Sequence, residues 1–144
     1  MISVSFNNFE IKDGQVLSKA YAQTPIYLDW DMEDGVYYTV IIYDIDAPSP
    51  SNQEYPFCHY LVVNMTIYRN QGDEILSYLP PNPPEGGKPH GYYINIFKQE
   101  EQTSPDYNIV YERQAFDVLD FIERHNLVLY DEFYFKVTPK RVGL

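Results

Sequence analysis

The stretch that decides the fold is Val36–Asp46, whose sequence is VYYTVIIYDID. It is almost continuously apolar and rich in β-branched and aromatic residues, which is typical of a strand buried on both faces. Such a strand lies in the middle of a sheet and needs neighbours on either side. The stretch ends with two carboxylates, Asp44 and Asp46, which share one face because side chains alternate along a strand.

Four further runs supply the neighbouring strands. Cys58–Ile67 and Tyr92–Phe97 have the same continuous apolar character as the first stretch. Ile2–Phe6 and Phe133–Val137 alternate apolar and polar residues, as half-exposed strands do. The 15 tyrosines and 8 phenylalanines of the chain also suit a pleated, half-buried surface. The pattern predicts a mainly β protein.

Only one segment has a strong helical period. From Gln114 to Asn126 the apolar residues recur at spacings of three and four, with polar residues between them. Asn126 readily adopts the left-handed conformation that ends a helix. The proline-rich segments 46–56 and 80–89 are predicted to be ordered loops, because proline cannot donate to a strand ladder.

Length and cysteine content narrow the class of protein. A chain of 144 residues fits one domain, residues 1–144, with a core that needs neither disulfide nor metal. The single cysteine, Cys58, excludes an internal disulfide framework and a thiolate-rich zinc site. It fits a reducing compartment, and neither a signal peptide nor an apolar run of membrane-spanning length is found. We therefore expect a cytoplasmic protein without a transmembrane segment.

The net charge of -11 argues against a nucleic-acid or anionic-membrane partner, since both require clustered Lys and Arg. The acidity is uneven. Residues 10–34 hold six acids and two bases, residues 100–132 hold nine and two, and the remainder holds six of each, which gives -4, -7 and 0. Residues 78–99 carry only Glu85, Lys88 and Lys98, a net of +1. A small anion held locally by a few donors is compatible with this distribution.

Ionisable side chains stand at the ends of the predicted strands. Asp44 and Asp46 finish one strand, His59 begins another, and His90 precedes a third that carries Tyr92. If these ends converge, two imidazoles, a phenol and a carboxylate line one small pocket. Imidazolium and tyrosine hydroxyl groups donate hydrogen bonds to phosphate or carboxylate, and an aspartate can fix a histidine tautomer. The sequence predicts a small-anion pocket with no metal and no cofactor.

A structural interpretation stays open for each of these residues. A histidine at the end of a strand often serves only as a hydrogen-bonded structural group. Asp46, which precedes Ala47 and Pro48, can simply begin a turn through an Asx hydrogen bond. His125 continues the apolar face of the predicted helix, so it is expected to be structural or a partner of the helix dipole.

Two catalytic or metal interpretations are weaker. Cys58 and His59 form no nucleophile and base, because neighbouring side chains of a strand point to opposite faces. His59, His90 and Asp44 match the composition of a two-histidine, one-carboxylate iron site. They lack the pair of ligands at short spacing that such a site usually shows.

Several blocks resemble the phosphatidylethanolamine-binding proteins, also called Raf kinase inhibitor proteins. Tyr38–Ser49 resembles their YTL-x-x-x-DPDAPS segment, and Cys58–Met65 resembles their HxLVVN strand. Pro83–Tyr92 is similar to PP-x-G-x-x-x-HRY, and Phe116–Leu127 to the single helix before the last core strand. Pro25–Trp30 matches an early P-x-x-x-x-W segment. The blocks occur in the family's order and cover most of residues 1–137.

The resemblance implies an antiparallel β core of two sheets in a Greek-key arrangement, with a small anion pocket at one end. The family's pocket binds phosphate-like groups, including phosphorylethanolamine, and is not an established catalytic centre. Members restrain kinases or serine proteases. The resemblance implies that Asp46 braces the pocket loop and that the ligand-binding residues are Asp44, Pro48, His59, Pro84, His90 and Tyr92.

The chain departs from the family's pattern at several positions. Ile45 replaces the proline of the DPD motif, and Gly91 replaces the arginine that usually follows the pocket histidine. Pro80 and Asn82 stand where the family often has glycine. Seven residues follow Val137, too few for the helix that closes over the pocket in animal members, so a more open pocket is expected.

Three functions remain compatible with the sequence. The first is a non-catalytic anion-binding regulator with a kinase or protease as its partner. The second is a hydrolase or lyase that uses His59 and His90 as acid and base on a phosphoester. The third is a protein-interaction module that works through the acidic surface around Glu112–Glu123.

Overall fold

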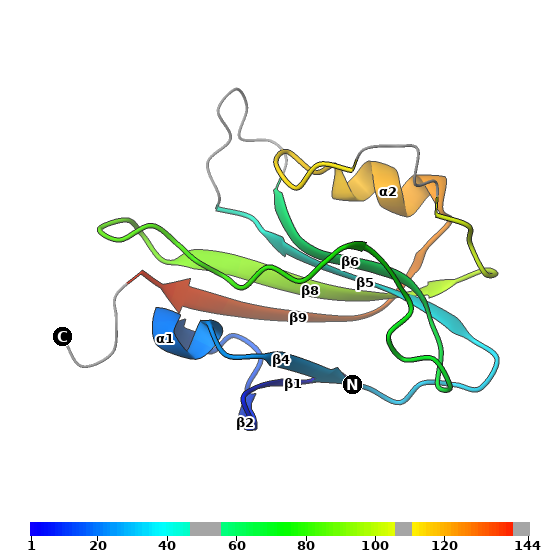
Figure 1. The fold of residues 1–144 in the computed structure, drawn as a ribbon, viewed down its shortest axis with the longest axis horizontal. Helices are drawn as coiled ribbons and strands as arrows, with labels where there is room; N and C mark the ends of the chain where they lie inside the picture. Colours follow the sequence, from blue (N-terminus) through cyan, green and yellow to red (C-terminus); the bar gives the residue numbers. More distant parts are fainter. Residues whose placement is uncertain (47–55, 106–110, 140–144) are drawn as a thin grey trace.

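Two β-sheets of unequal size pack face to face in the computed structural model, which describes residues 1–46, 56–105 and 111–139 (Figure 1). The smaller sheet is antiparallel, with the order β2–β1–β4. Its strands are β1 (Ser3–Phe6), β2 (Phe9–Ile11) and β4 (Ile26–Asp29). The apolar residues predicted to alternate in the first strand, including Val4 and Phe6, point into the core between the sheets.

The larger sheet has six strands in the order β3–β9–β8–β5–β6–β7. All neighbours are antiparallel except β3 and β9, which run parallel. Within it, β8–β5–β6–β7 forms a Greek key, because three consecutive strands are followed by one that returns beside the first. The strands are β3 (Val16–Ser18), β5 (Tyr37–Asp44), β6 (Phe57–Met65), β7 (Asp73–Leu76), β8 (His90–Gln99) and β9 (Val128–Thr138).

The central position predicted for the first stretch is confirmed. Strand β5 pairs with β6 on one side and with β8 on the other. Val40 and Ile42 belong to the core between the sheets, whereas Ile41 points to a second core beneath helix α2 (Val118–Arg124). Burial on both faces explains why this strand carries no polar alternation.

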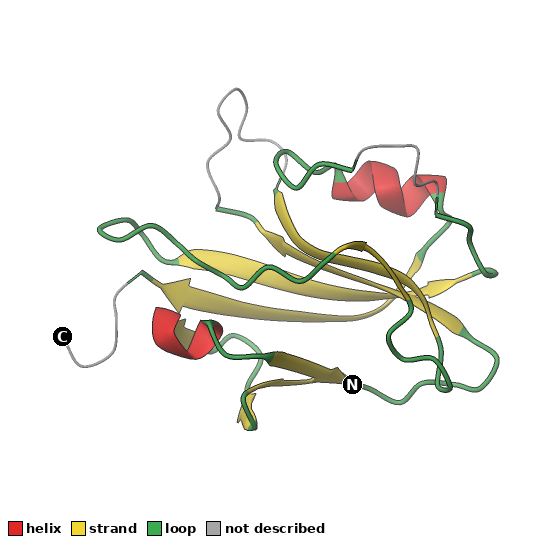
Figure 2. Cartoon of the chain, in the orientation of Figure 1, coloured by secondary structure: helices red, strands yellow, loops and turns green. Residues whose placement is uncertain are grey.

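Helix α2 covers the outer face of the larger sheet but begins later than the apolar period predicts (Figure 2). Residues 114–117 are not helical, since Ala115 has φ 51° and the Phe116 N–H donates to the Pro56 carbonyl at 2.8 Å. Asp117 then caps the helix by accepting from the Asp120 N–H. The predicted end is confirmed, because Asn126 has φ 50°.

The structure adds five short elements that the sequence pattern does not predict. These are β2, β3, β4, β7 and the single turn α1 (Lys19–Ala22). Each has only three or four residues, too few for a helical or strand period to be recognised. Neither helix in the described part of the chain is long and apolar enough to span a membrane.

The connection from β7 to β8, residues 77–89, crosses the face of the larger sheet (Figure 1). It contains no strand or helix, as its prolines predict. Three hydrogen bonds hold this connection in place. The Leu79 N–H donates to the His59 carbonyl at 2.8 Å. The side chain of Gln23, which follows α1, donates to the Pro81 carbonyl, and that of Lys19 in α1 donates to the Pro83 carbonyl. The other predicted loop, 46–56, lies largely outside the described residues.

Candidate functional site

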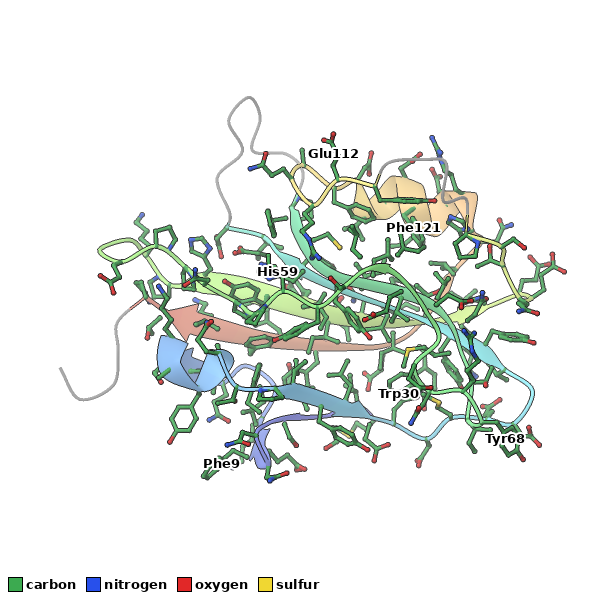
Figure 3. All side chains as sticks on the ribbon, in the orientation of Figure 1. Phe9, Trp30, His59, Tyr68, Glu112 and Phe121 are labelled. Carbon is green, nitrogen blue, oxygen red and sulfur yellow. The ribbon has the colours of Figure 1, made fainter. Side chains whose placement is uncertain are left out.

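A cleft of about 400 Å³ opens at the end of the larger sheet where β5 ends and β6 and β8 begin. The antiparallel register brings these ends together, because Asp44 is the partner of both Phe57 and Tyr92. Figure 3 labels His59, which lies where the connection 77–89 passes over the sheet. The lining residues are Gln23, Asp44, Phe57, His59, Leu79, Pro80, Asn82, Pro84, His90, Tyr92 and Gln114.

His90 and Asp44 form a buried pair at the start of β8 and the end of β5. The His90 Nδ1 lies 2.7 Å from an Asp44 carboxylate oxygen. Because a carboxylate accepts hydrogen bonds, the Nδ1 of His90 carries a proton. The Nε2 atom makes no hydrogen bond within the described residues and is the nitrogen left for a ligand.

His59 is held in the same tautomer by a different acceptor. Its Nδ1 lies 2.6 Å from the carbonyl oxygen of Leu79, which can only accept, so Nδ1 again carries the proton. Burial lowers the pKa of His59 below 6.5, although the bond to Leu79 and the nearby Asp44 charge act in the opposite direction. In its neutral form the ring presents Nε2 as an acceptor.

Tyr92 brings its hydroxyl group close to the Asp44 carboxylate. Its ring stacks on Phe135 at 5.4 Å and meets the edge of His59 at 5.3 Å. Its buried hydroxyl has no hydrogen-bond partner of good geometry within the described residues. Burial, and secondarily the Asp44 carboxylate, raises the pKa of Tyr92, so the hydroxyl stays protonated and can donate to a ligand.

Asp46 ties the end of β5 to the start of β8. Its carboxylate accepts from the Gly91 N–H at 2.7 Å, and the neighbouring Ile45 N–H donates to the Gly91 carbonyl at 3.1 Å. The turn that Asp46 itself could begin falls on residues 47–49, outside the described residues. The Asp44 carboxylate makes an Asx-type bond, since it accepts from the Asp46 N–H at 2.7 Å. This arrangement is compatible with the bracing role that the resemblance implies.

The residue that replaces the family's arginine has a structural explanation. A Cβ atom at Gly91 would collide with the Tyr134 hydroxyl and lie 2.9 Å from Cε2 of that ring. Tyr134 also packs on Tyr93, with ring centroids 4.8 Å apart. Tyr134 therefore fills the space into which a side chain at position 91 would extend.

The structure brings most of the predicted site residues together. Asp44, His59, Pro84, His90 and Tyr92 all line the cleft. Pro48 lies outside the described residues. Within those residues, no group of three His, Cys, Asp or Glu side chains is placed to hold a metal ion.

Other parts of the cleft have no signature in the sequence. The Leu79 carbonyl orients His59, and Gln23 and Gln114 lie just outside the recognised blocks Pro25–Trp30 and Phe116–Leu127. Arg113 donates to the carbonyls of Cys58, His59 and Ser77, so it joins β6 to the connection 77–89. The quoted family motifs do not include it, and in the sequence it is only one of the two bases, with Arg124, of the acidic segment 100–132.

Cys58 points away from the cleft. Its fully buried side chain belongs to the core beneath α2, opposite to His59. Burial raises the pKa of the Cys58 thiol to about 12. A thiol with this pKa holds almost no thiolate at neutral pH and cannot serve the cleft as a nucleophile.

The fold is thus a two-sheet β architecture with a Greek key in the larger sheet, and a cleft of histidine, tyrosine and aspartate lies at its strand ends. The sequence model described as "Phosphatidylethanolamine-binding protein" matches residues 7–130. The chain belongs to this family.

Known proteins agree with this assignment in sequence and in fold. The chain is 27% identical over 128 residues to "Putative odorant-binding protein A5" of Drosophila melanogaster, and the matched region is 84% of this chain and 61% of that relative. It is 32% identical over 129 residues to "Protein TWIN SISTER of FT" of Arabidopsis thaliana, covering 85% and 67%. The chain thus spans only about two thirds of the length of these curated relatives.

Two solved structures share the fold at low identity. A carboxypeptidase Y inhibitor, crystallised in complex with its cognate proteinase, superposes with a TM-score of 0.73 at 19% identity, covering 96% of this chain and 83% of that one. A phosphatidylethanolamine-binding protein from Plasmodium vivax gives a TM-score of 0.72 at 16% identity, covering 96% and 85%. Identities this low establish the fold alone.

Proposed function

We propose that the chain acts as a single domain, residues 1–144, that binds a phosphate or carboxylate group and regulates a partner protein without catalysis of its own. The observation that carries this proposal is the meeting of His59, His90 and Tyr92 in one cleft. Both Nε2 atoms and the Tyr92 hydroxyl hold the anion, and Asp44 orients His90. Pro84 contributes to the wall, and Pro48 is expected to do the same.

The tautomers make anion binding depend on protonation. With Nδ1 of both rings donating to fixed acceptors, each neutral ring offers only an acceptor at Nε2. A carboxylate or a fully ionised phosphate group also offers only acceptors, so at least one Nε2 takes up a proton when such an anion binds. Affinity for such an anion therefore rises as the pH falls toward the pKa of His59, which burial lowers.

The partner is proposed to be a protease or a kinase whose activity the chain restrains. The support is the fold shared with the carboxypeptidase Y inhibitor that was crystallised with its cognate proteinase. The anion held in the cleft is a phosphorylated or carboxylated group, with phosphorylethanolamine as one source. Neither a metal nor a cofactor takes part in this proposal, and a cytoplasmic location remains a prediction from the single cysteine.

The imidazole signals of the cleft report anion binding directly. Addition of phosphate or phosphorylethanolamine is expected to shift the NMR resonances of His59 and His90, and His90→Ala is expected to abolish the shift of His59. The third histidine, His125, packs on Phe121 outside the cleft and serves as an internal reference for pH and ionic strength. Unchanged His59 and His90 signals at millimolar ligand would contradict the proposal.

An enzyme is the competing function, since the Asp44–His90 pair resembles the acid and base units of hydrolases. The described residues of the cleft contain no activated nucleophile, because Cys58 lies on the other face and the pKa of Tyr92 is raised. Turnover of phosphoesters by the wild-type chain, lost in His59→Ala, would reverse the preference for a binding protein.

A further inference from the structure

A second cavity, of about 930 Å³, opens between the two sheets and shares no lining residue with the histidine cleft. Residues of β4, the edge strand of the smaller sheet, and of β7, the edge strand of the larger one, both line it. We call it the β4–β7 groove. Its lining comprises Pro25 to Met32, Tyr60, Met65, Ile67, Asn70 to Glu74 and Tyr78.

The floor of the groove is largely aromatic. The rings of Tyr60 and Tyr78 meet edge to face at 6.0 Å, and Trp30 packs in the same manner on Tyr38 at 5.6 Å. Figure 3 shows Trp30 close to the end of β4, on the side of the molecule where the β6–β7 turn carries Tyr68. Met65 completes this apolar surface.

Two buried donors in this floor have no acceptor. Trp30 is only 6% exposed, yet its indole Nε1 makes no hydrogen bond within the described residues. The buried hydroxyl of Tyr78 is also without a partner there. A buried donor left unpaired is unfavourable, and because both atoms are covered, a ligand's acceptor gains affinity from them only if neighbouring side chains move aside.

The charged residues that line the groove all have the same sign. They are Asp29, Asp31, Asp73 and Glu74, and only Asp73 is neutralised, by Arg69 at 2.6 Å. Asp29, Asp31 and Glu74 form no ion pair within the described residues. Three uncompensated carboxylates around an apolar floor complement a ligand that carries Lys or Arg.

Free strand edges flank the groove. Within the described residues, β4 pairs only with β1 and β7 only with β6. In β4, Ile26 and Leu28 turn inward while Tyr27 and Asp29 are exposed. A strand added beside β4 would extend the smaller sheet, lay alternate side chains on Tyr60 and Met65, and bond to the main chain of β4.

We propose that the β4–β7 groove binds an extended basic segment of a partner protein as an added strand on the edge of β4. A second copy of this chain fits less well, since its net charge of -11 would repel the carboxylates of the groove. A small apolar amine would satisfy the charge but would leave the edge of β4 unused. The proposal is independent of the histidine cleft.

The test uses Trp30, which is the only tryptophan in the chain, as a fluorescent reporter of the groove. The probe is a blocked six-residue peptide of alternating Lys and Val. We expect a saturable change in emission and a shift of the Trp30 indole NMR signal, with the matched Glu–Val peptide binding at least about tenfold more weakly because like charges repel. Equal affinity for the two peptides, or no response to either by fluorescence and NMR, would overturn the proposal.

Charge variants locate the binding. The combined variant Asp29→Asn, Asp31→Asn and Glu74→Gln is expected to weaken binding of the Lys–Val peptide by about tenfold. The matched control, Glu100→Gln, Glu112→Gln and Glu123→Gln, changes the net charge equally at exposed sites outside the groove. Loss of affinity that is the same in both variants shows a general charge effect and rejects the groove.

Strand addition is tested by methylating alternate backbone nitrogens of the peptide, in both possible registers. Only one register removes the donors that face β4, so we expect one methylated peptide to lose binding and the other to retain it. Equal binding of both peptides overturns the proposed mode. Equally strong binding of n-octylamine assigns the groove to a small amine and likewise rejects the added strand.

Discussion

Gly91 and Tyr134 are coupled through the space that they share. A Cβ atom at position 91 would meet the Tyr134 ring, so Gly91→Ala is expected to destabilise the protein by about 1–2 kcal/mol through overpacking. In a Tyr134→Ala background the same substitution is expected to have little effect. Urea unfolding of the four proteins measures this coupling as a double-mutant cycle.

Additive effects in that cycle would show that Tyr134 moves aside freely. The coupling would then be near zero, and the loss of the family's arginine would need another explanation. A second comparison, Gly91→Arg in the two backgrounds, asks whether the smaller residue at position 134 lets an arginine be accommodated.

His59 contributes to the pH dependence of stability. Burial lowers its folded-state pKa below 6.5, so the unfolded chain binds a proton more readily. The contribution of His59 to the free energy of unfolding is present in full above pH 6.5 and is lost as the pH falls through that value toward the folded-state pKa. We expect His59→Gln to lose less stability than wild type on acidification, measured by urea unfolding above and below pH 6.5 without phosphate. A parallel decrease in the two proteins would contradict this assignment.

At the scale of elements, helix α2 depends on the cap that sets its late start. The Asp117 carboxylate accepts from the Asp120 N–H at 3.0 Å. Asp117→Ala is expected to lower the free energy of unfolding by about 1 kcal/mol, and Asp117→Asn by much less, because asparagine still caps. Chemical denaturation followed by circular dichroism measures both values, and equal losses would show that charge or packing, not the cap, is responsible.

The elements also show how far a sequence predicts this fold. The long strands β5, β6 and β8 are predictable because burial on both faces leaves a continuous apolar pattern. The apolar period places the start of α2 too early because the hydrogen bond from Phe116 to Pro56 is a tertiary contact with no local signal. The three- and four-residue strands β3, β4 and β7 are fixed by their neighbours in the sheets, which no local window contains.

The same limit applies to the cleft. Asp44, His59 and His90 could be predicted to meet because they stand at strand ends and adjacent antiparallel strands bring such ends together. The carbonyl of Leu79, which orients His59, could not, because every residue carries a carbonyl group. Gly91 is recognisable in the sequence as a departure, but its cause is visible only with Tyr134 in place on the neighbouring strand.

At the scale of the whole molecule, charge is separated between the two cavities. The histidine cleft has Asp44 as its only carboxylate among the described lining residues, and that carboxylate is paired with His90. The β4–β7 groove has four carboxylates. A net charge of -11 therefore does not oppose a small anion at one cavity, and it favours a basic segment at the other.

The Greek-key connection makes one strand pairing of the larger sheet depend on residues that are far apart in the sequence. Strands β6 and β7 lie between β5 and β8 in the sequence, although β8 pairs directly with β5. Asp44 therefore meets His90 only when a long stretch of chain closes into a loop, which is entropically unfavourable. Folding dominated by such distant pairings is slow compared with that of helical proteins. During synthesis, a chain that has emerged only as far as β7 still lacks one histidine and the tyrosine of the cleft. The anion-binding groups proposed for the cleft are therefore complete only after β8 has paired with β5.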